Sequence, residues 1–435
     1  MKGKILKIIT APSMPLFYRI VLVVTLLDLI YLIFLGASFS IFAPYKPKRL
    51  LMVEASISSG QGIVAHANNE FAFDLYAVLA KREKGNILYS PFCIFSSLAL
   101  AYEGANGETA DEIKSVFHFP KVDKLRKNFA IIYNDLKKTY GAYELRMGNA
   151  LWVQRDYPLL KDYKNIVKRY YSGKAENLDF AKKTEKSRLT INKFIEKQTG
   201  GRIRGLITAG CINQLTMFVL TNTIHFTGTW KQQFDPEDTE EMDFKITPDS
   251  VVKVPMMRTT TYRKGFNYAD LGNLQILELP YLGGISMLIL LPTESLDSIE
   301  PLSARKLAEY KSQMQITKLD AIFLPKFEIE AEYILNDHLK TLGMPTAFNA
   351  KRADFSGMTN NEGLFISSVI HHTCVKVNEK GTKAYTATAT IIACTPEMVK
   401  RKRKIFLADH PFIFIIQQKH NGNILFFGRL IDPTQ

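Results

Sequence analysis

The order of its periodic patterns most limits what this 435-residue chain can fold into. Helical patterns come first, in "NNEFAFDLYAVLAKR", "SPFCIFSSLALAYEGANG" and "ETADEIKSVFHF", where apolar residues recur at helical spacing. Short apolar or alternating runs that end at Gly, Pro or Asn follow, such as "MFVLTNTIHFTGTW", "SMLILLP" and "NILFFGRLIDP". Helices followed by strands, with further helices interspersed, predict an α+β fold and argue against a doubly wound parallel sheet.

A strong strand pattern near the C-terminus runs directly into a charged segment. The stretch from Thr382 to Thr395 has no Gly or Pro and consists mostly of Thr, Ala and Ile, which favour strands. Pro396 and the basic run Lys400–Lys404 follow it and are typical of an exposed loop. An exposed stretch of this composition is an unpaired strand edge that is able to join a sheet. An ordinary buried strand is the alternative, and it fits the first half of the stretch only.

The N-terminus carries an apolar segment, residues 20–43, in which Asp28 is the single charge. Its length is that of a membrane-spanning helix, and the basic residues before it predict a cytoplasmic N-terminus and an exported remainder. An uncleaved signal anchor is favoured over a cleaved signal peptide ending near Gly36–Ser38, and a true start at Met52 is a further alternative. We therefore expect residues 1–43 to be the anchor or signal peptide, residues 44–67 a linker, and residues 68–435 the globular domain. The domain would be extracellular or at the cell surface, either membrane-anchored or secreted.

Composition and motifs exclude several functional classes. The four cysteines have neither zinc-site spacing nor the density of a disulfide scaffold. The nucleophile elbow, the zinc-protease motif and the phosphate-binding loop are missing, so we expect no enzyme, no metal and no cofactor. "HHTC", from His371 to Cys374, lies in a strand pattern whose neighbours face opposite ways, which favours structural roles over a metal site or a catalytic dyad. The net charge of +14 favours acidic partners, but a nucleic-acid-reading motif is missing too.

Several long segments resemble the serpin family. "VNEKGTKAYTATAT", from Val377 to Thr390, is similar to the serpin hinge and reactive loop, whose pattern is Glu, one residue, Gly, Thr and then mostly small residues. "NILYSPFCIFSSLALAYEGANGETADEI" resembles the helix B and C signature, and "TNTIHFTGTWKQQF" the strand and turn that carry the breach tryptophan. "LELPY", "SMLILLP", "LPKF", "ADFSGM" and "ADHPFIFII" follow in family order. The resemblance covers residue 68 to the C-terminus and looks nearest to prokaryotic members.

The resemblance implies a serpin fold, with a large mixed or antiparallel central sheet, additional sheets, surrounding helices and an exposed reactive loop. It also implies the known activity of that family, a suicide-substrate inhibitor of serine proteases whose cleaved loop inserts as a new strand and traps the acyl-enzyme. The target would be a subtilisin-like, trypsin-like or chymotrypsin-like protease, and we expect a monomer. A non-inhibitory serpin-fold protein for binding or folding assistance, cleaved without trapping, is the alternative.

Site residues carry over from the family pattern position by position. The hinge would comprise Glu379, Gly381, Thr382, Ala384 and Thr386. The scissile-bond region would comprise Cys394, Thr395, Pro396 and Met398. The shutter and breach, where the sheet opens, would comprise Ser90, Cys93, Asn222, Trp230 and His371. Cys93 stands where a second Ser is usual, and a thiol forms weaker hydrogen bonds than a hydroxyl.

The loop residues fit an inserted strand, with two departures. Residues on one face are small or β-branched, namely Thr382, Ala384, Thr386, Thr388, Thr390 and Ile392. Lys383 and Tyr385 share the opposite, solvent-facing side, where Tyr385 is larger than the family prefers. Family spacing from Gly381 puts the bait bond before Pro396, and proteases rarely cut there because proline lacks the amide N–H. The alternatives are Cys394–Thr395, Met398–Val399 and Lys400–Arg401.

A basic helical pattern, "KVDKLRKNFAIIYNDLKK", falls where some serpins bind sulfated polysaccharides. The residues that could bind such a polyanion are Lys124, Arg126, Lys127, Lys137 and Lys138. A solvated helix face is the alternative interpretation.

Overall fold

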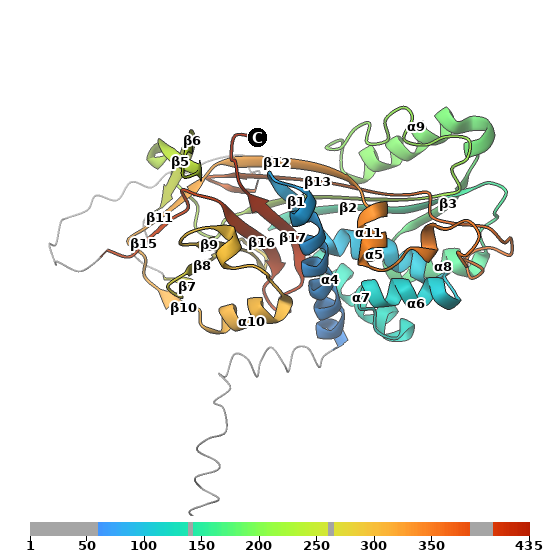
Figure 1. Ribbon diagram of the computed structural model, residues 1–435, viewed down its shortest axis with the longest axis horizontal. Coiled ribbons are helices and arrows are strands. Elements are labelled where there is room, and N and C mark those ends of the chain that lie inside the picture. Colours follow the sequence, from blue (N-terminus) through green and yellow to red (C-terminus); the bar gives the residue numbers. More distant parts are fainter. Residues whose placement is uncertain (1–59, 138–141, 260–264, 383–402) are drawn as a thin grey trace, which may run out of the picture. The chain divides into compact units, whose positions relative to one another are not determined.

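A computed structural model describes residues 60–137, 142–259, 265–382 and 403–435. The expected anchor at residues 20–43, most of the expected linker and most of the expected reactive loop lie outside these ranges. Across the described ranges, every helix is too short or too polar to cross a bilayer. The described elements are labelled as in Figure 1.

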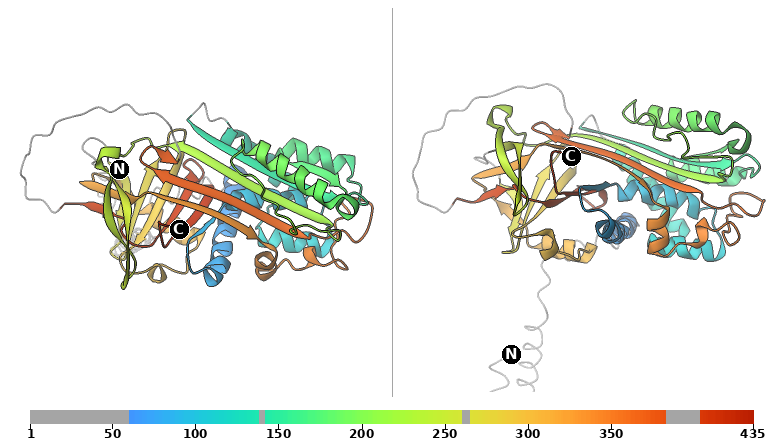
Figure 2. Two further views of the ribbon diagram at one scale, coloured as in Figure 1. Left: turned by 90° about the horizontal axis from the view of Figure 1, so that it is seen from above. Right: turned by 45° about the horizontal axis from the view of Figure 1, so that its top comes forward.

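The central sheet has six strands in the order β12-β13-β14-β4-β2-β3. β13 runs parallel to β4, with Ser368–Cys374 opposite Val219–His225, whereas β2 and β4 are antiparallel, so the sheet is mixed as predicted. Figure 2 shows β4 and β13 as long neighbouring strands. The strands of this sheet are β2 (Tyr143–Gln154), β3 (Lys174–Leu178), β4 (Phe218–Thr229), β12 (Phe327–Ile334), β13 (Ser368–Asn378) and β14 (Gly381–Thr382).

Two further sheets complete the α+β architecture. The seven-stranded sheet is antiparallel, in the order β1-β17-β16-β9-β8-β7-β10, and the four-stranded sheet has the order β15-β11-β6-β5. β9 and β16 are buried along their whole length, which explains their continuous apolar runs. The strands are β1 (Ile87–Tyr89), β5 (Glu240–Thr247), β6 (Ser250–Thr259), β7 (Phe266–Asp270), β8 (Leu274–Pro280), β9 (Ile285–Pro292), β10 (Gln315–Thr317), β11 (Ala321–Pro325), β15 (Ile405–Leu407), β16 (Phe412–Gln418) and β17 (Ile424–Leu430).

Helices pack on both faces of the central sheet (Figure 1). The buried helix α5 packs against β2, β4 and β17. Ser90 caps its N-terminus, and the Ser90 side chain accepts a hydrogen bond from the Cys93 backbone N–H. On the other face, α9 forms a separate apolar cluster with Trp152, Val219 and Ile370. The helices are α4 (Gly60–Arg82), α5 (Pro91–Tyr102), α6 (Gly107–Val116), α7 (Val122–Lys137), α8 (Lys161–Tyr171), α9 (Phe180–Gln198), α10 (Ala304–Ser312) and α11 (Asn336–Leu342).

The first described helix begins earlier than predicted. α4 starts at Gly60, so residues 60–67, which were expected to end the linker, are helical. Val64 is fully buried, and this contact with the core extends the helix into a segment without clear periodicity. Asn68 lies inside the helix and donates to Ile424 O at 2.9 Å. Its buried amide therefore binds the C-terminal strand and does not cap the helix.

Candidate functional site

The predicted hinge residues Gly381 and Thr382 form the short strand β14, which lies between β13 and β4 in the central sheet. β13 and β4 pair directly as far as Cys374 and His225. Beyond this point the short strand β14 lies between them, antiparallel to both, with Thr382 opposite Val377 on one side and Gly228 on the other. Gly381 and Thr382 of the predicted hinge are thus paired with both strands. Below them β13 and β4 pair directly along a closed seam, with Ser368–Cys374 opposite Val219–His225.

Gly381 occupies a position that requires glycine. Its φ is 142°, a region that side chains rarely adopt. A Cβ atom at this position would lie 2.0 Å from the carbonyl oxygen of Gly228. Close approach to β4 and the unusual backbone angle together explain the glycine of the hinge pattern.

Trp230 and Tyr281 pack against each other and bind residues of the β13–β14 hairpin. Trp230 is 2% exposed, stacks on Tyr281 with ring centroids 4.1 Å apart, and donates from Nε1 to Asn378 O at 2.9 Å. The Tyr281 hydroxyl lies 2.8 Å from Oγ1 of the buried Thr382. Tyr281 ends the "LELPY" segment, but nothing in that segment alone reveals its partner on the hinge.

Glu379 is held by two side chains from other elements. Its Oε1 lies 3.0 Å from Lys326 Nζ and accepts from Thr239 Oγ1 at 3.0 Å. Partial burial alone would raise the pKa of Glu379, but hydrogen bonds from its own backbone, from Lys326 and from Thr239 lower it overall. The carboxylate therefore stays ionised and fixes the turn between β13 and β14.

His371 connects the closed seam to helix α5. Its Nε2 accepts from the Ser90 backbone N–H at 3.0 Å, and its Nδ1 donates to Asn222 Oδ1 at 2.5 Å. Asn222 in turn donates to Ser97 Oγ at 3.2 Å. Complete burial lowers the pKa of His371 to about 3, so the imidazole is neutral.

Cys93 belongs to a neighbouring polar group. Its Sγ lies 3.2 Å from Asn149 Oδ1, and Asn149 donates to Ser96 Oγ at 2.6 Å. Burial raises the pKa of the Cys93 thiol well above its ordinary value, which keeps it protonated as a donor. Sequence reasoning missed Ser96 and Ser97, although their spacing from Cys93 places all three on one face of α5.

The "HHTC" segment divides between the two faces of β13, as its strand pattern predicts. His371 faces α5, whereas His372 is on the other face, with Nε2 2.9 Å from Glu330 Oε1. Over the part of the chain that is described, His, Cys, Asp and Glu side chains form no group suited to a metal ion.

Several predicted site residues cannot be placed. Ala384, Thr386, Cys394, Thr395, Pro396 and Met398 lie outside the described residues, as does Lys138. The roles assigned to them from the sequence stay predictions.

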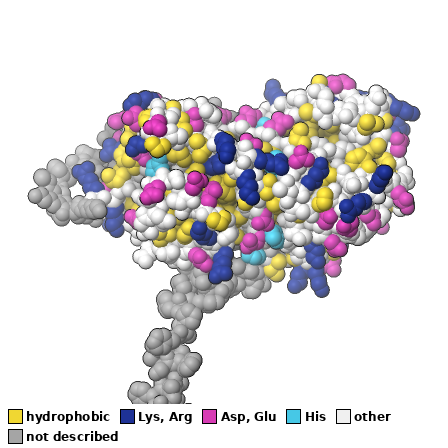
Figure 3. Space-filling model, in the orientation of Figure 1, with side chains coloured by type: hydrophobic (Ala, Val, Ile, Leu, Met, Phe, Trp, Pro, Cys, Tyr) yellow, Lys and Arg dark blue, Asp and Glu magenta, His cyan; other side chains and the backbone are white. Residues whose placement is uncertain are grey.

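The predicted polyanion patch lies on α7. Lys124, Lys127 and Lys137 are exposed there. Arg126 instead donates from Nε and Nη2 to Glu103, with bonds between 2.6 and 3.0 Å, and the Glu103 side chain is fully buried. Two of its three nitrogens are thus committed to a structural ion pair. Figure 3 shows basic and acidic side chains interspersed over the displayed face, with no single basic field.

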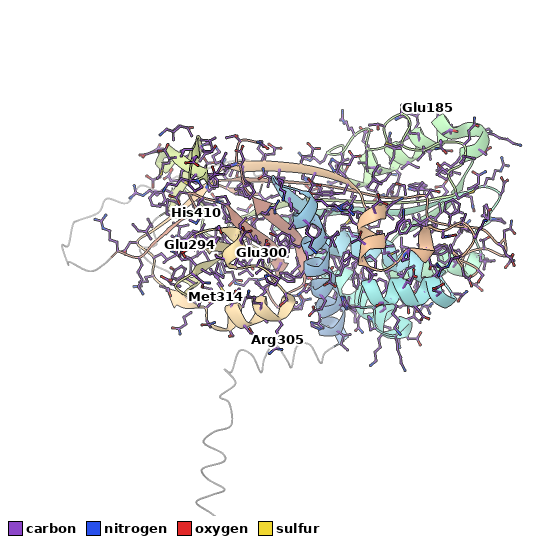
Figure 4. All side chains as sticks on the ribbon, in the orientation of Figure 1. Glu185, Glu294, Glu300, Arg305, Met314 and His410 are labelled. Carbon is purple, nitrogen blue, oxygen red and sulfur yellow. The ribbon has the colours of Figure 1, made fainter. Side chains whose placement is uncertain are left out.

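The segment after the loop is anchored at His410. Its Nδ1 lies 2.8 Å from Asp409 Oδ1 and its Nε2 lies 2.6 Å from Pro292 O. Burial alone would lower the pKa of His410, but the hydrogen bonds to Asp409 and Pro292 raise it overall. Figure 4 shows His410 at the end of the domain that carries β5 and β6.

The central sheet is mixed, and the short strand β14 lies between β13 and β4. Comparisons with known proteins identify the family that has this fold. Residues 66–433 match the family described as serpin (serine protease inhibitor). A serpin-like protein from Thermococcus kodakarensis is 41% identical over 85% of this chain and 86% of its own length. Leukocyte elastase inhibitor A from Rattus norvegicus is 34% identical over 85% and 99%. The crystal structure of human thyroxine-binding globulin has a TM-score of 0.77 at 30% identity and covers 87% of this chain and 100% of that one.

This chain belongs to the serpin family. The family resemblance, its prokaryotic relatives and the predicted fold are confirmed. The family comprises protease inhibitors rather than enzymes, and it includes inhibitory relatives such as the rat elastase inhibitor.

Proposed function

We propose that this chain inhibits a serine protease as a suicide substrate, by cleavage of its reactive loop and insertion of the cleaved loop into the central sheet. The observation that carries the proposal is the wedge of β14 between β13 and β4. Each pairing of β14 uses the ladder positions that a longer inserted strand would use. Insertion then requires the seam at Ser368–Cys374 to separate, and the neutral His371 with its two partners lies on that seam.

The pairing register of β13 and β14 also favours bait bonds close to Thr395 over bonds further along the loop. Thr382 is opposite Val377 and Gly381 is opposite Asn378, so each step forward along the loop matches one step back along β13. The rule places Ile391 opposite Ser368, the first residue of β13. A bait bond at Cys394–Thr395 or after Thr395 leaves only a few residues beyond the sheet. A bait bond after Met398 or Lys400 would leave a longer tether between the sheet and the bound protease, about 3.3 Å longer for each added residue.

A panel of proteases tests the proposal. The domain is mixed with subtilisin-like, trypsin-like and chymotrypsin-like enzymes and examined for an adduct that survives boiling in detergent. We expect one such adduct and a C-terminal peptide whose sequence identifies the bait bond. Cleavage by all three enzymes without an adduct would contradict inhibition. That outcome would favour a binding role, such as the one that the name of human thyroxine-binding globulin describes.

We propose an extracellular or cell-surface location, through an anchor or signal peptide at residues 1–43. The proposal rests on the apolar composition of residues 20–43 and the basic residues before them. Protease added to intact cells should digest the domain, and full protection would contradict export.

A further inference from the structure

A pocket of about 330 Å³ lies at the base of the closed seam, at the end of the central sheet opposite the hinge. Gln154, the last residue of β2, and Met217, directly before β4, line one part of it. Asn361 and Glu362, from the segment before β13, line another part. The pocket therefore spans both sides of the seam, because β13 forms one side and β4 with β2 the other. Its volume is within the range of pockets that bind small ligands.

The charge of the pocket favours a cation. The carboxylates of Asp156 and Glu362 are exposed in it, whereas Lys and Arg are absent from its described lining. In the part of the chain that is described, neither carboxylate forms an ion pair, and the neighbouring Arg155 lies 3.8 Å from Asp179 instead. Tyr157 adds an aromatic ring, whose face attracts cations. This acidic lining stands out in a chain whose net charge is +14.

A buried amide holds one of the two carboxylates in place. Gln154 is 4% exposed, and its Oε1 accepts from the Phe180 backbone N–H at 2.8 Å. Its Nε2 donates to Asp156 Oδ2 at 3.0 Å. The backbone carbonyl of Asp156 accepts from Asn361 Nδ2 at 2.7 Å. The position of Asp156 is thus fixed from both sides of the seam before any ligand binds, which lowers the entropic cost of binding.

We propose that this pocket binds a small organic cation with guanidinium or amine groups between Asp156 and Glu362, and that the bound cation favours the closed seam. N–H donors that carry a positive charge form strong hydrogen bonds with carboxylates. Two hydrogen bonds already connect the sides of the seam here. One is the bond from Asn361 to Asp156, and the other runs from the Met217 N–H to Ser367 Oγ at 2.9 Å.

A cation between the two carboxylates adds a third link between the sides of the seam. Insertion of a strand separates β13 from β4, so it moves the segment before β13 away from β2 and β4. A ligand that binds the closed arrangement more tightly shifts the equilibrium towards it. This preference for the closed seam rests on the proposed loop insertion, whereas the binding itself does not.

Titration calorimetry of the intact full-length protein with agmatine tests the site. Agmatine is a short alkyl chain with a guanidinium at one end and an ammonium at the other. We expect binding at one site per chain that weakens as sodium chloride is added, because salt screens exposed charges. Butanediol, a neutral chain of similar length, should not bind. Absence of agmatine binding would overturn the site.

Variants of the two carboxylates provide the matched test. Glu362→Gln and Asp156→Asn each remove one charge and keep a side-chain oxygen, and each should weaken agmatine binding by roughly tenfold. Glu294→Gln is the control, because Glu294 is an exposed carboxylate after β9 that does not line the pocket. It should leave the affinity unchanged. Equal affinity in the wild type, Glu362→Gln and Asp156→Asn would overturn the site as well.

The same titration with loop-cleaved protein separates the site from the function beneath it. We expect agmatine to bind the intact form more tightly, by roughly fivefold or more. If cleavage stabilises the protein but both forms bind agmatine equally, the preference for the closed seam is wrong and the site stands. If cleavage does not stabilise the protein, loop insertion itself is wrong, and binding to the intact form still decides whether the site exists.

Discussion

At the scale of single residues, His371 makes the stability of the fold depend on pH. Its pKa is about 3 in the fold and near the ordinary value of 6.5 once unfolded. Between these values the unfolded chain binds a proton that the folded chain does not. We therefore expect the free energy of unfolding to fall as pH drops from about 6.5 towards 3, by up to about 1.4 kcal/mol per pH unit, with no contribution above 6.5. Denaturant unfolding at pH 7 and pH 5 measures this slope, and His371→Gln should flatten it.

His410 is the control for this prediction, because its pKa is shifted in the opposite direction. Its contribution is fully present below the ordinary value of 6.5 and is lost as pH rises through the raised pKa. His410→Gln should leave the slope on the acid side in place. A slope between pH 7 and pH 5 that is equal in the wild type and in His371→Gln would contradict the assignment to His371.

At the scale of elements, the two-residue strand β14 depends on its glycine. Gly381→Ala adds a Cβ that would contact Gly228 O at a positive φ, so we expect β14 to leave its place between β13 and β4. The cost should be about 1–3 kcal/mol of stability. Trp230 packs beneath this strand and should become more exposed. Its emission is measured in a Trp152→Phe background, because the chain has only two tryptophans.

Gly85→Ala is the matched control for the hinge variant, since a Cβ there meets no atom within 4 Å. It should leave the Trp230 emission unchanged. If Gly381→Ala also leaves the emission and the unfolding midpoint unchanged, the hinge does not depend on this backbone conformation.

At the scale of the whole molecule, proposed insertion competes with simple release of the cleaved loop. The ladder register places Tyr385 between Cys374 and His225 in the inserted strand. A large ring that must enter between these residues slows insertion. A barrier higher by about 1 kcal/mol corresponds to a roughly fivefold lower rate of insertion. We expect Tyr385→Ala to reduce the number of inhibitor molecules consumed for each protease molecule inhibited. Titration of a responsive protease against each variant measures this ratio.

Tyr385→Phe is the control, because it keeps the ring and removes only the hydroxyl. It should resemble the wild type. Equal ratios for all three proteins would mean that the size of residue 385 does not limit insertion.

Much of the fold followed from local patterns, because alternation and helical spacing depend on neighbouring residues alone. The buried runs of β9 and β16 are of this kind, whereas the hinge glycine was assigned from the family resemblance. The start of α4 was missed because Val64 is buried by a contact that no local pattern signals. Tyr281, Thr239 and Lys326 were missed as partners of the hinge for the same reason. Each is distant in sequence from the residue that it contacts.

The sequence by itself determined the α+β class, through its helical and strand patterns, and the family, through the segments that resemble serpins. Only the tertiary structure decided which distant groups meet. His371 contacts Ser90 and Asn222, which are 281 and 149 positions away, and Arg126 binds the buried Glu103 although its helix looked like a solvated basic face. The reason is physical: a hydrogen bond needs its partners within about 3 Å, and between distant segments that distance is set by strand register and packing.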